Sequence, residues 1–290
     1  MLASPLAVIA AREAFAAGKM TLSMHQQTSA GAGYQKSLEG WARAGIKNVE
    51  LTAASVDAFV KTDSLPAARR ILTDLGLTPV SSASGTFGIW EPGPMRAMAV
   101  ENFKRRCEMF ASLGLTRIYT PSAAMQKFTQ DDYKTGADNM REVGVIAKQF
   151  GLTAMIEATR ASTFVAALPT MLTMTRAAGN VAPLLDCYHF WSGPSKLEDL
   201  DLIKPGEIGH VHFQDTPDLP RELLEQTTRV IPGDGVAPLQ TILRKLASRG
   251  YAGPLSVELF LPKYTQGDPF EVAREIRQKS EVVMRRAGVM

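Results

Sequence analysis

Two of the four histidines of this 290-residue chain stand two positions apart, as His210 and His212 in the segment Gly209–Asp215. Side chains two positions apart on a β-strand point to the same face, so both imidazoles would share one face. Imidazoles on a short, otherwise apolar strand are costly to bury without polar partners. The motif alone fits a hydrogen-bonded pair in the core as well as a metal site. Its meaning depends on what other segments place beside it.

Three further apolar segments carry a carboxylate at or near their ends: Glu157, Asp186 and Glu258. If these segments are parallel strands, their ends lie at one edge together with His212. Three carboxylates converging there would repel one another unless a cation lay between them. Oxygen and nitrogen donors without a thiolate suit Mn²⁺ best, with Mg²⁺, Co²⁺ or Zn²⁺ as alternatives. The sequence therefore predicts one divalent metal ion at these four residues, against the alternative of structural ion pairs.

The elements that must position these residues alternate along the chain. Apolar or β-branched runs predict strands over 19–25, 48–51, 78–83, 116–120, 153–157, 181–186, 208–213 and 254–260. Amphipathic segments predict helices over 34–45, 65–76, 95–114, 131–151, 162–179, 195–203, 236–250 and 269–287, many of them ending in glycine. Strict alternation of this kind indicates parallel βα units, and eight units in this length indicate a (β/α)8 TIM barrel. An open doubly wound sheet is the alternative, but the glycines of Ser29–Gly33 lack the spacing of a phosphate-binding turn.

We expect a single domain over residues 1–290, in which residues 1–18 form an N-terminal helical extension, because Ser4-Pro5 precedes an amphipathic pattern. The formal net charge is only +3, without a dense Lys/Arg run, so no nucleic-acid partner is expected. No segment reaches the ~18 apolar residues of a membrane span, so no membrane partner is expected either. Cys107 and Cys187 lie far apart and match no disulfide or metal pattern, which favours reduced thiols and a cytoplasmic location.

Several motifs together resemble the sugar isomerase/epimerase family of xylose-isomerase-like barrels, which includes ketose 3-epimerases, hydroxypyruvate isomerases, and inosose isomerases and dehydratases. The motifs lie in the C-terminal half: Ile156-Glu157, Asp186-x-x-His189, His210-Val-His212-Phe-x-Asp215, Arg229-Val-Ile-Pro-Gly233-x-Gly235 and Gly250–Glu258. The resemblance implies a divalent metal on Glu157, Asp186, His212 and Glu258. It also implies that the two glutamates act as acid and base across the substrate. His189 would hold a substrate oxygen, and Arg229 would contact substrate or brace Glu258.

Such a site serves proton transfer at a carbon next to a carbonyl, with the metal stabilising the enediolate. We therefore expect a metal-dependent isomerase or epimerase of a sugar or keto-sugar. If a β-hydroxyl leaves instead, the same site gives a dehydratase, an inosose dehydratase-like lyase. The basic residue that ketose 3-epimerases usually carry after the strand histidine is missing from Gln214–Asp218, which weighs against a simple ketohexose substrate. Which glutamate is the base stays open.

Other residues near strand ends are candidates for substrate contacts. His25 ends the first expected strand, Trp90 follows the third and Trp191 follows the sixth, where their rings could stack on a sugar. His210, one pleat deeper than His212, is expected to orient a ligand through a hydrogen bond. An endonuclease IV-like function would need several more histidines than this chain has. A non-catalytic sugar-binding barrel remains as the rival reading, and the oligomeric state stays open between a monomer and a dimer or tetramer.

Overall fold

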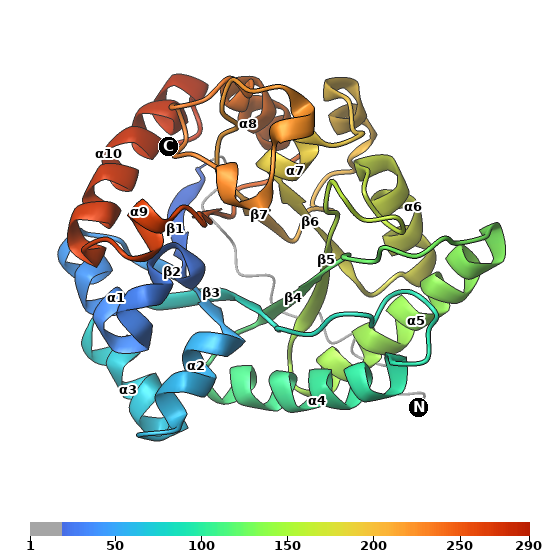
Figure 1. Cartoon of the computed structure of the whole chain (residues 1–290), viewed down its shortest axis with the longest axis horizontal. Helices are drawn as coiled ribbons and strands as arrows, with labels where there is room; N and C mark the ends of the chain where they lie inside the picture. Colours follow the sequence, from blue (N-terminus) through green and yellow to red (C-terminus); the bar gives the residue numbers. More distant parts are fainter. Residues whose placement is uncertain (1–18) are drawn as a thin grey trace, which may run out of the picture.

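The computed structural model describes residues 19–290, and in this part of the chain the strands form a closed parallel barrel in the order β1 to β8. Figure 1 looks along the barrel, with the strands around the centre and the helices outside them. The predicted TIM barrel is thereby confirmed. The expected helical extension over residues 1–18 lies outside the described residues. The strands are Thr21–His25 (β1), Asn48–Thr52 (β2), Thr78–Ala83 (β3), Arg117–Pro121 (β4), Thr153–Glu157 (β5), Ala182–Asp186 (β6), His210–His212 (β7) and Pro254–Val257 (β8).

The helices pack around this ring and return the chain to the start of the next strand (Figure 1). They are Gly33–Arg43 (α1), Ala53–Val60 (α2), Leu65–Asp74 (α3), Arg96–Ser112 (α4), Gln130–Gln149 (α5), Leu168–Ala178 (α6), Cys187–Ser192 (α7), Leu239–Ser248 (α8), Pro262–Thr265 (α9) and Pro269–Ala287 (α10). Four 3-10 segments join them: Gln26–Ala32 (η1), Leu197–Leu202 (η2), Arg221–Leu223 (η3) and Gln226–Thr228 (η4).

The sequence expectations differ from the structure at several short elements. The helices α2, α7 and α9 were not expected, and the segment expected as a helix over 195–203 is the 3-10 segment η2. The helix expected from residue 162 begins only at Leu168, because Ser162 and Thr163 hydrogen-bond to Ser122 and Ala124 in the segment after β4. The last strand ends at Val257, so Glu258 lies on the first residue after β8.

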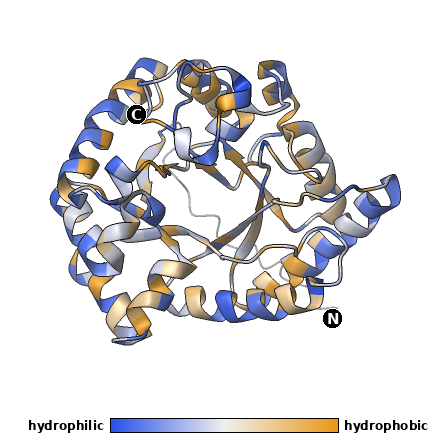
Figure 2. Ribbon diagram, in the orientation of Figure 1, coloured by the Kyte–Doolittle hydropathy of each residue, from blue (hydrophilic) through white to orange (hydrophobic). Residues whose placement is uncertain are grey.

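The barrel closes because each strand pairs in parallel with the next, ending with β8 against β1, where Leu22 lies opposite Leu255. Apolar side chains on the outside of the strands pack against the inner faces of the helices, and the outer faces of the helices are hydrophilic (Figure 2). The predicted glycine helix ends are confirmed, since Gly179, Gly250 and four others have positive φ, a backbone conformation that glycine adopts without a Cβ penalty.

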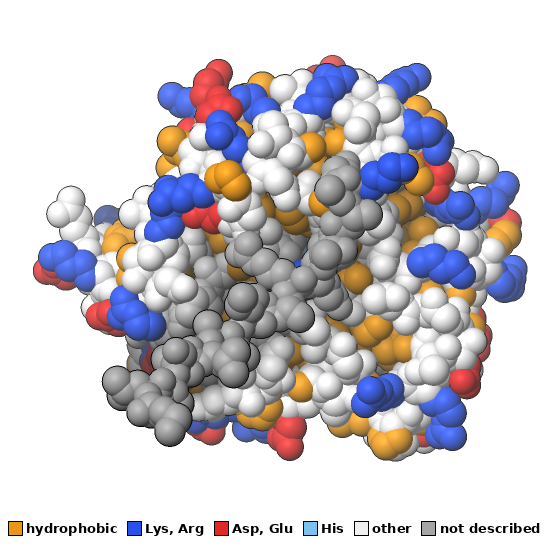
Figure 3. All heavy atoms as spheres, turned by 180° about the vertical axis from the view of Figure 1, so that it is seen from behind, with side chains coloured by type: hydrophobic (Ala, Val, Ile, Leu, Met, Phe, Trp, Pro, Cys, Tyr) orange, Lys and Arg blue, Asp and Glu red, His pale blue; other side chains and the backbone are white. Residues whose placement is uncertain are grey.

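The polar groups of the barrel interior gather at the carboxyl ends of the strands, where barrel enzymes place their active sites. The opposite face, seen in Figure 3, carries Lys and Arg side chains spaced around its edge, several beside Asp or Glu. Within residues 19–290, no helix is long and apolar enough to cross a membrane.

Candidate metal centre

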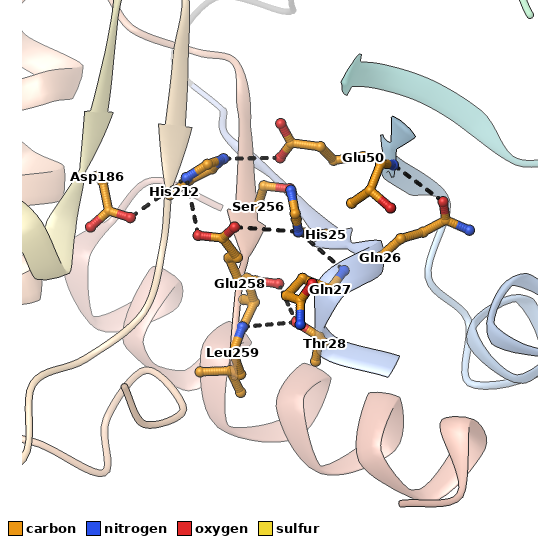
Figure 4. Close-up of polar contacts among 12 residues, drawn as sticks. His25, Gln26, Gln27, Thr28, Glu50, Asp186, His212, Ser256, Glu258 and Leu259 are labelled. Atoms are coloured by element: carbon orange, nitrogen blue, oxygen red, sulfur yellow. Dashed lines mark hydrogen bonds and ion pairs between the residues drawn. The ribbon is translucent and has the colours of Figure 1, made fainter. Parts of the chain in front are cut away.

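Four side chains from four consecutive strand ends meet inside the carboxyl-end opening of the barrel. Glu157 ends β5, Asp186 ends β6, His212 ends β7 and Glu258 follows β8. Each offers one ligand atom, and these atoms all lie within 4.8 Å of one another. All four residues are buried. Figure 4 shows His212 with Asp186 and Glu258 on one side of its ring and Glu50 on the other.

The spacing of the donor atoms fits a single ion. His212 Nδ1 lies 2.8 Å from Glu157 Oε1, 3.5 Å from Asp186 Oδ2 and 3.6 Å from Glu258 Oε2. Donors bound to one ion at about 2.1 Å lie roughly 3.0 Å apart at octahedral positions and roughly 3.4 Å apart at tetrahedral positions. The donor set, three carboxylates and one imidazole, is also one that divalent cations accept. The residues therefore fit a divalent cation by both spacing and chemistry.

Glu50, on β2, is a member of this cluster that the sequence analysis missed. Its Oε2 lies 3.0 Å from His210 Nε2 and 3.2 Å from His212 Nε2, and all three side chains are fully buried. With Nε2 directed at Glu50, the Nδ1 of His212 is left to face the carboxylates. A carboxylate behind a ligand histidine fixes the tautomer and the ring orientation. His210 contacts the same carboxylate, and the expectation that it orients a ligand stays a prediction. The signal in the sequence was a glutamate within the otherwise apolar strand Val49-Glu50-Leu51.

Arg229 bridges two of the acidic residues, Asp186 and Glu258. Its Nη1 lies 3.1 Å from Asp186 Oδ2 and also donates to Glu258 Oε2, and the side chain is fully buried. Asp215 and Val230 exchange two backbone hydrogen bonds, and Asp215 Oδ2 accepts from the Gly233 amide at 2.9 Å. These contacts hold the segment that carries Arg229. Of the two roles implied for Arg229, the structure shows the brace on Glu258, and Arg229 does not line the cavity.

Asp186 is held by two further groups besides Arg229. Its Oδ1 accepts from the backbone amide of His189 at 2.7 Å and so caps the short helix α7. Its Oδ2 accepts from the side-chain amide of Gln214. The cap turns the expected loop into a helix and places His189 over the site. There His189 Nε2 lies 2.8 Å from Arg229 Nη2, and the ring lines the cavity.

Glu258 is positioned by a chain of hydrogen bonds from β1 and β4. His25 Nδ1 accepts from the Gln27 amide at 3.2 Å and lies 3.5 Å from Glu258 Oε1, and His25 Nε2 lies 3.1 Å from Tyr119 Oη. The Tyr119 hydroxyl in turn donates to Glu258 Oε1 at 3.5 Å. Tyr119 was not among the residues singled out in the sequence. Its position on β4 gave no motif that could have indicated this role.

The environments of the acidic groups differ. Burial raises the pKa of Glu157 to about 7, although His212 opposes this shift. Burial also acts on Glu258, but Arg229, His25 and His212 together outweigh it and lower its pKa. Burial lowers the pKa of His189 to about 4, so this ring is neutral at pH 7.

A cavity of about 550 Å³ lies above the four residues, and Glu157, Glu258, His25 and His189 line it. The two tryptophans expected to contact substrate do not line it. Trp90 is fully buried in the core, where its Nε1 donates to the Thr120 carbonyl at 3.0 Å. Trp191, on α7, is half-buried, with the Arg221 guanidinium over its ring. The aromatic residues that line the cavity are Phe87, Tyr119 and Phe260.

Comparison with known proteins agrees with this geometry. The model of the family described as "Xylose isomerase-like TIM barrel" matches residues 38–283. The chain belongs to this family. The resemblance drawn from the C-terminal motifs is thereby confirmed at the level of the family, and the matched region extends into the N-terminal half.

Two relatives of this chain are named for an activity. An inosose isomerase of Halalkalibacterium halodurans is 30% identical over 174 residues, which cover 58% of this chain and 61% of the relative. The match thus spans less than two thirds of that relative's length. A 3-dehydroshikimate dehydratase of Pseudomonas putida is 28% identical over 236 residues, covering 78% of this chain and 36% of the relative.

A solved structure shares the whole barrel. The IolI protein, solved with a bound zinc atom, superposes on this chain with a TM-score of 0.85 at 23% identity. The superposition covers 92% of this chain and 99% of the IolI chain. At 23% sequence identity, this similarity shows a shared fold and nothing about function.

Proposed function

We propose that the protein is a divalent-metal-dependent isomerase or epimerase that transfers a proton at a carbon next to the carbonyl of a sugar or keto-sugar. The observation that carries the proposal is the placement of Glu157 and Glu258. Both line the same cavity, and both have a carboxylate oxygen within 3.6 Å of the same nitrogen of His212. The match to relatives named inosose isomerase supports this class of reaction.

The ion would be held by Glu157, Asp186, His212 and Glu258. We propose Mn²⁺, with Mg²⁺, Co²⁺ and Zn²⁺ as alternatives, because the donor set contains no thiolate. When bound, a divalent cation stabilises the negative charge that develops on substrate oxygens as the proton leaves.

The side chains of the site would divide the remaining work. Glu157 and Glu258 remove and return the proton, to the opposite face of the carbon in an epimerisation or to the neighbouring carbon in an isomerisation. His189, neutral and held by Arg229, binds a substrate oxygen. Arg229 keeps Glu258 in place, and the His25–Tyr119 pair fixes the other oxygen of the same carboxylate.

A dehydratase is the second candidate, and one observation favours it. The match to the Pseudomonas putida 3-dehydroshikimate dehydratase covers 78% of this chain. The match to the inosose isomerase of Halalkalibacterium halodurans covers 58% of this chain. The same proton abstraction leads to loss of water if a hydroxyl stands on the adjacent carbon. Detection of an unsaturated product by its ultraviolet absorbance would distinguish elimination from isomerisation.

The test is solvent deuterium exchange into a keto-substrate by the Mn²⁺-loaded protein. Glu157→Gln and Glu258→Gln should each lower the exchange rate by about 10²-fold or more, the usual contribution of a general acid or base. The exposed Glu142, in a surface pair with Arg96, gives the control Glu142→Gln, which should exchange at the parent rate. Metal content is measured in each variant. Exchange at the parent rate in Glu258→Gln with metal retained would contradict the proposal.

A further inference from the structure

The wall of the cavity is divided between two halves of the barrel. The polar half comes from the ends of β5 to β8 and from β1, and includes Glu157, His189, Gln226 and Glu258. The other half, at the ends of β2 to β4, is lined mainly by small apolar side chains and one phenyl ring. These are Ala53, Ala54, Ala83, Phe87, Pro121 and Ala123.

The hydroxyl groups of the β3 and β4 ends are paired with one another behind this wall. Ser84 Oγ lies 2.7 Å from Thr120 Oγ1, and Ser122 Oγ lies 2.9 Å from Ser162 Oγ. All four are buried. They are therefore already satisfied and do not serve a ligand.

The two polar side chains of β2 and β4 that do line the cavity are also engaged. Thr52 Oγ1 donates to Ser55 Oγ at 2.8 Å, and the Tyr119 hydroxyl is directed at His25 and Glu258. The wall thus offers few polar partners to the part of a ligand that lies farthest from β5 to β8.

Phe87 adds an aromatic surface to this wall. It lies on the loop after β3, lines the cavity and is 60% exposed. A large ring left this accessible beside a binding cavity is a surface on which an apolar group can be buried.

The cation of the cavity wall is held by the loops around it. Among the described residues, Arg160 is the one Lys or Arg that lines it, and its guanidinium donates to the backbone carbonyls of Ser192, Leu224 and Arg221. Three of the five N–H groups of Arg160 are thereby used to hold the two loops beside the cavity.

A free inosose carries hydroxyls around its whole ring, and those turned to the apolar half would lose water without gaining partners. We propose that the substrate is a keto-sugar that bears an aromatic or other apolar substituent, with the sugar at the metal centre and the substituent against Phe87 and the alanines. The inference rests on the proposed function for the position of the sugar. It goes beyond that function in assigning a glycoside-like substrate.

The test compares ligands that differ only in the substituent. Binding of methyl and phenyl 3-keto-β-D-glucopyranoside to the Mn²⁺-loaded protein is measured by calorimetry, with scyllo-inosose as a third ligand. The phenyl compound should bind about tenfold or more tightly than the methyl compound, because its ring is buried against the apolar half. Scyllo-inosose should bind more weakly than the phenyl compound.

Phe87→Ala should lower the affinity for the phenyl compound and so remove most of the difference between the phenyl and methyl compounds. Met98 on α4 is also 60% exposed but does not line the cavity, so Met98→Ala is the matched control and should keep the difference. Equal affinity of the two glycosides, binding of neither, or tighter binding of scyllo-inosose overturns the inference. Failure of the proposed function is seen separately, as absent deuterium exchange with the affinity difference intact.

Discussion

The carboxylate of Glu50 lies 3.2 Å from Nε2 of His212, with both side chains fully buried. Because Glu50 also contacts His210, one carboxylate serves two imidazoles, and both histidines help to keep its pKa well below the ordinary value despite burial. The contact determines which nitrogen of His212 faces the cavity. The proposed metal centre therefore depends on a residue that does not itself line the cavity.

Glu50→Gln is expected to weaken metal binding by about 10- to 100-fold, since outer partners of ligand histidines commonly contribute that much. The amide keeps the size of the side chain and removes the charge that orients His212. Affinity for Mn²⁺ is measured by competition with a chelator of known affinity. Glu142→Gln is the control, and an unchanged affinity in Glu50→Gln would show that His212 is oriented by packing alone.

The sequence predicted the site residues that lie at strand ends and missed Glu50, because Glu50 reaches the site only through a contact between distant strands. The proposed ligands Glu157, Asp186, His212 and Glu258 were predicted from strand ends, which the barrel necessarily brings to one edge. Glu50 lies in the middle of a barrel strand, and only the register β1–β2, with His25 opposite Glu50, places it beside the histidines. Its contact with His212 spans the barrel interior, which no strand pattern reveals.

Aromatic residues on loops were harder to place. Trp90 follows β3, as a substrate-stacking residue would, but its backbone carbonyl accepts from Asn139 on α5 and its ring turns into the core. Phe87, three positions earlier, lines the cavity instead. The path of a loop depends on its tertiary partners, so position after a strand did not determine which ring faces the site.

Arg229→Met is expected to destabilise the metal-free protein by about 3–5 kcal/mol, because it leaves Asp186 and Glu258 buried without their shared cation. Urea denaturation with and without Mn²⁺ measures the change. A bound cation compensates the same carboxylates, so the loss should be smaller in the presence of metal. Arg229→Lys, which retains the charge, separates charge from geometry. A Met variant as stable as the parent without metal would contradict the bridging role.

Metal affinity should fall as the pH is lowered through 7. In the metal-free protein the pKa of Glu157 is about 7, and the pKa of His212 is raised well above its ordinary value because Glu50, Glu157 and Glu258 outweigh its burial. Both groups must lose their protons to act as ligands, so protons compete with the ion. Calorimetry in two buffers of different ionisation enthalpy should show proton release at pH 6.5. An affinity that is constant from pH 6 to pH 8 would contradict these protonation states.

Arg160→Met is expected to loosen the segment between β7 and α8 that overhangs the cavity. The guanidinium of Arg160 donates to the carbonyls of Leu224 and Arg221 in that segment and to the carbonyl of Ser192. Losing these bonds should raise amide hydrogen exchange over residues 219–228 and raise KM more than it lowers kcat, because the segment carries Gln226 and Leu224 of the cavity wall. Arg105→Met, which removes an exposed arginine of α4, is the control. If exchange in this segment stayed at the parent level while KM rose, Arg160 would be acting on the substrate directly rather than through the loop.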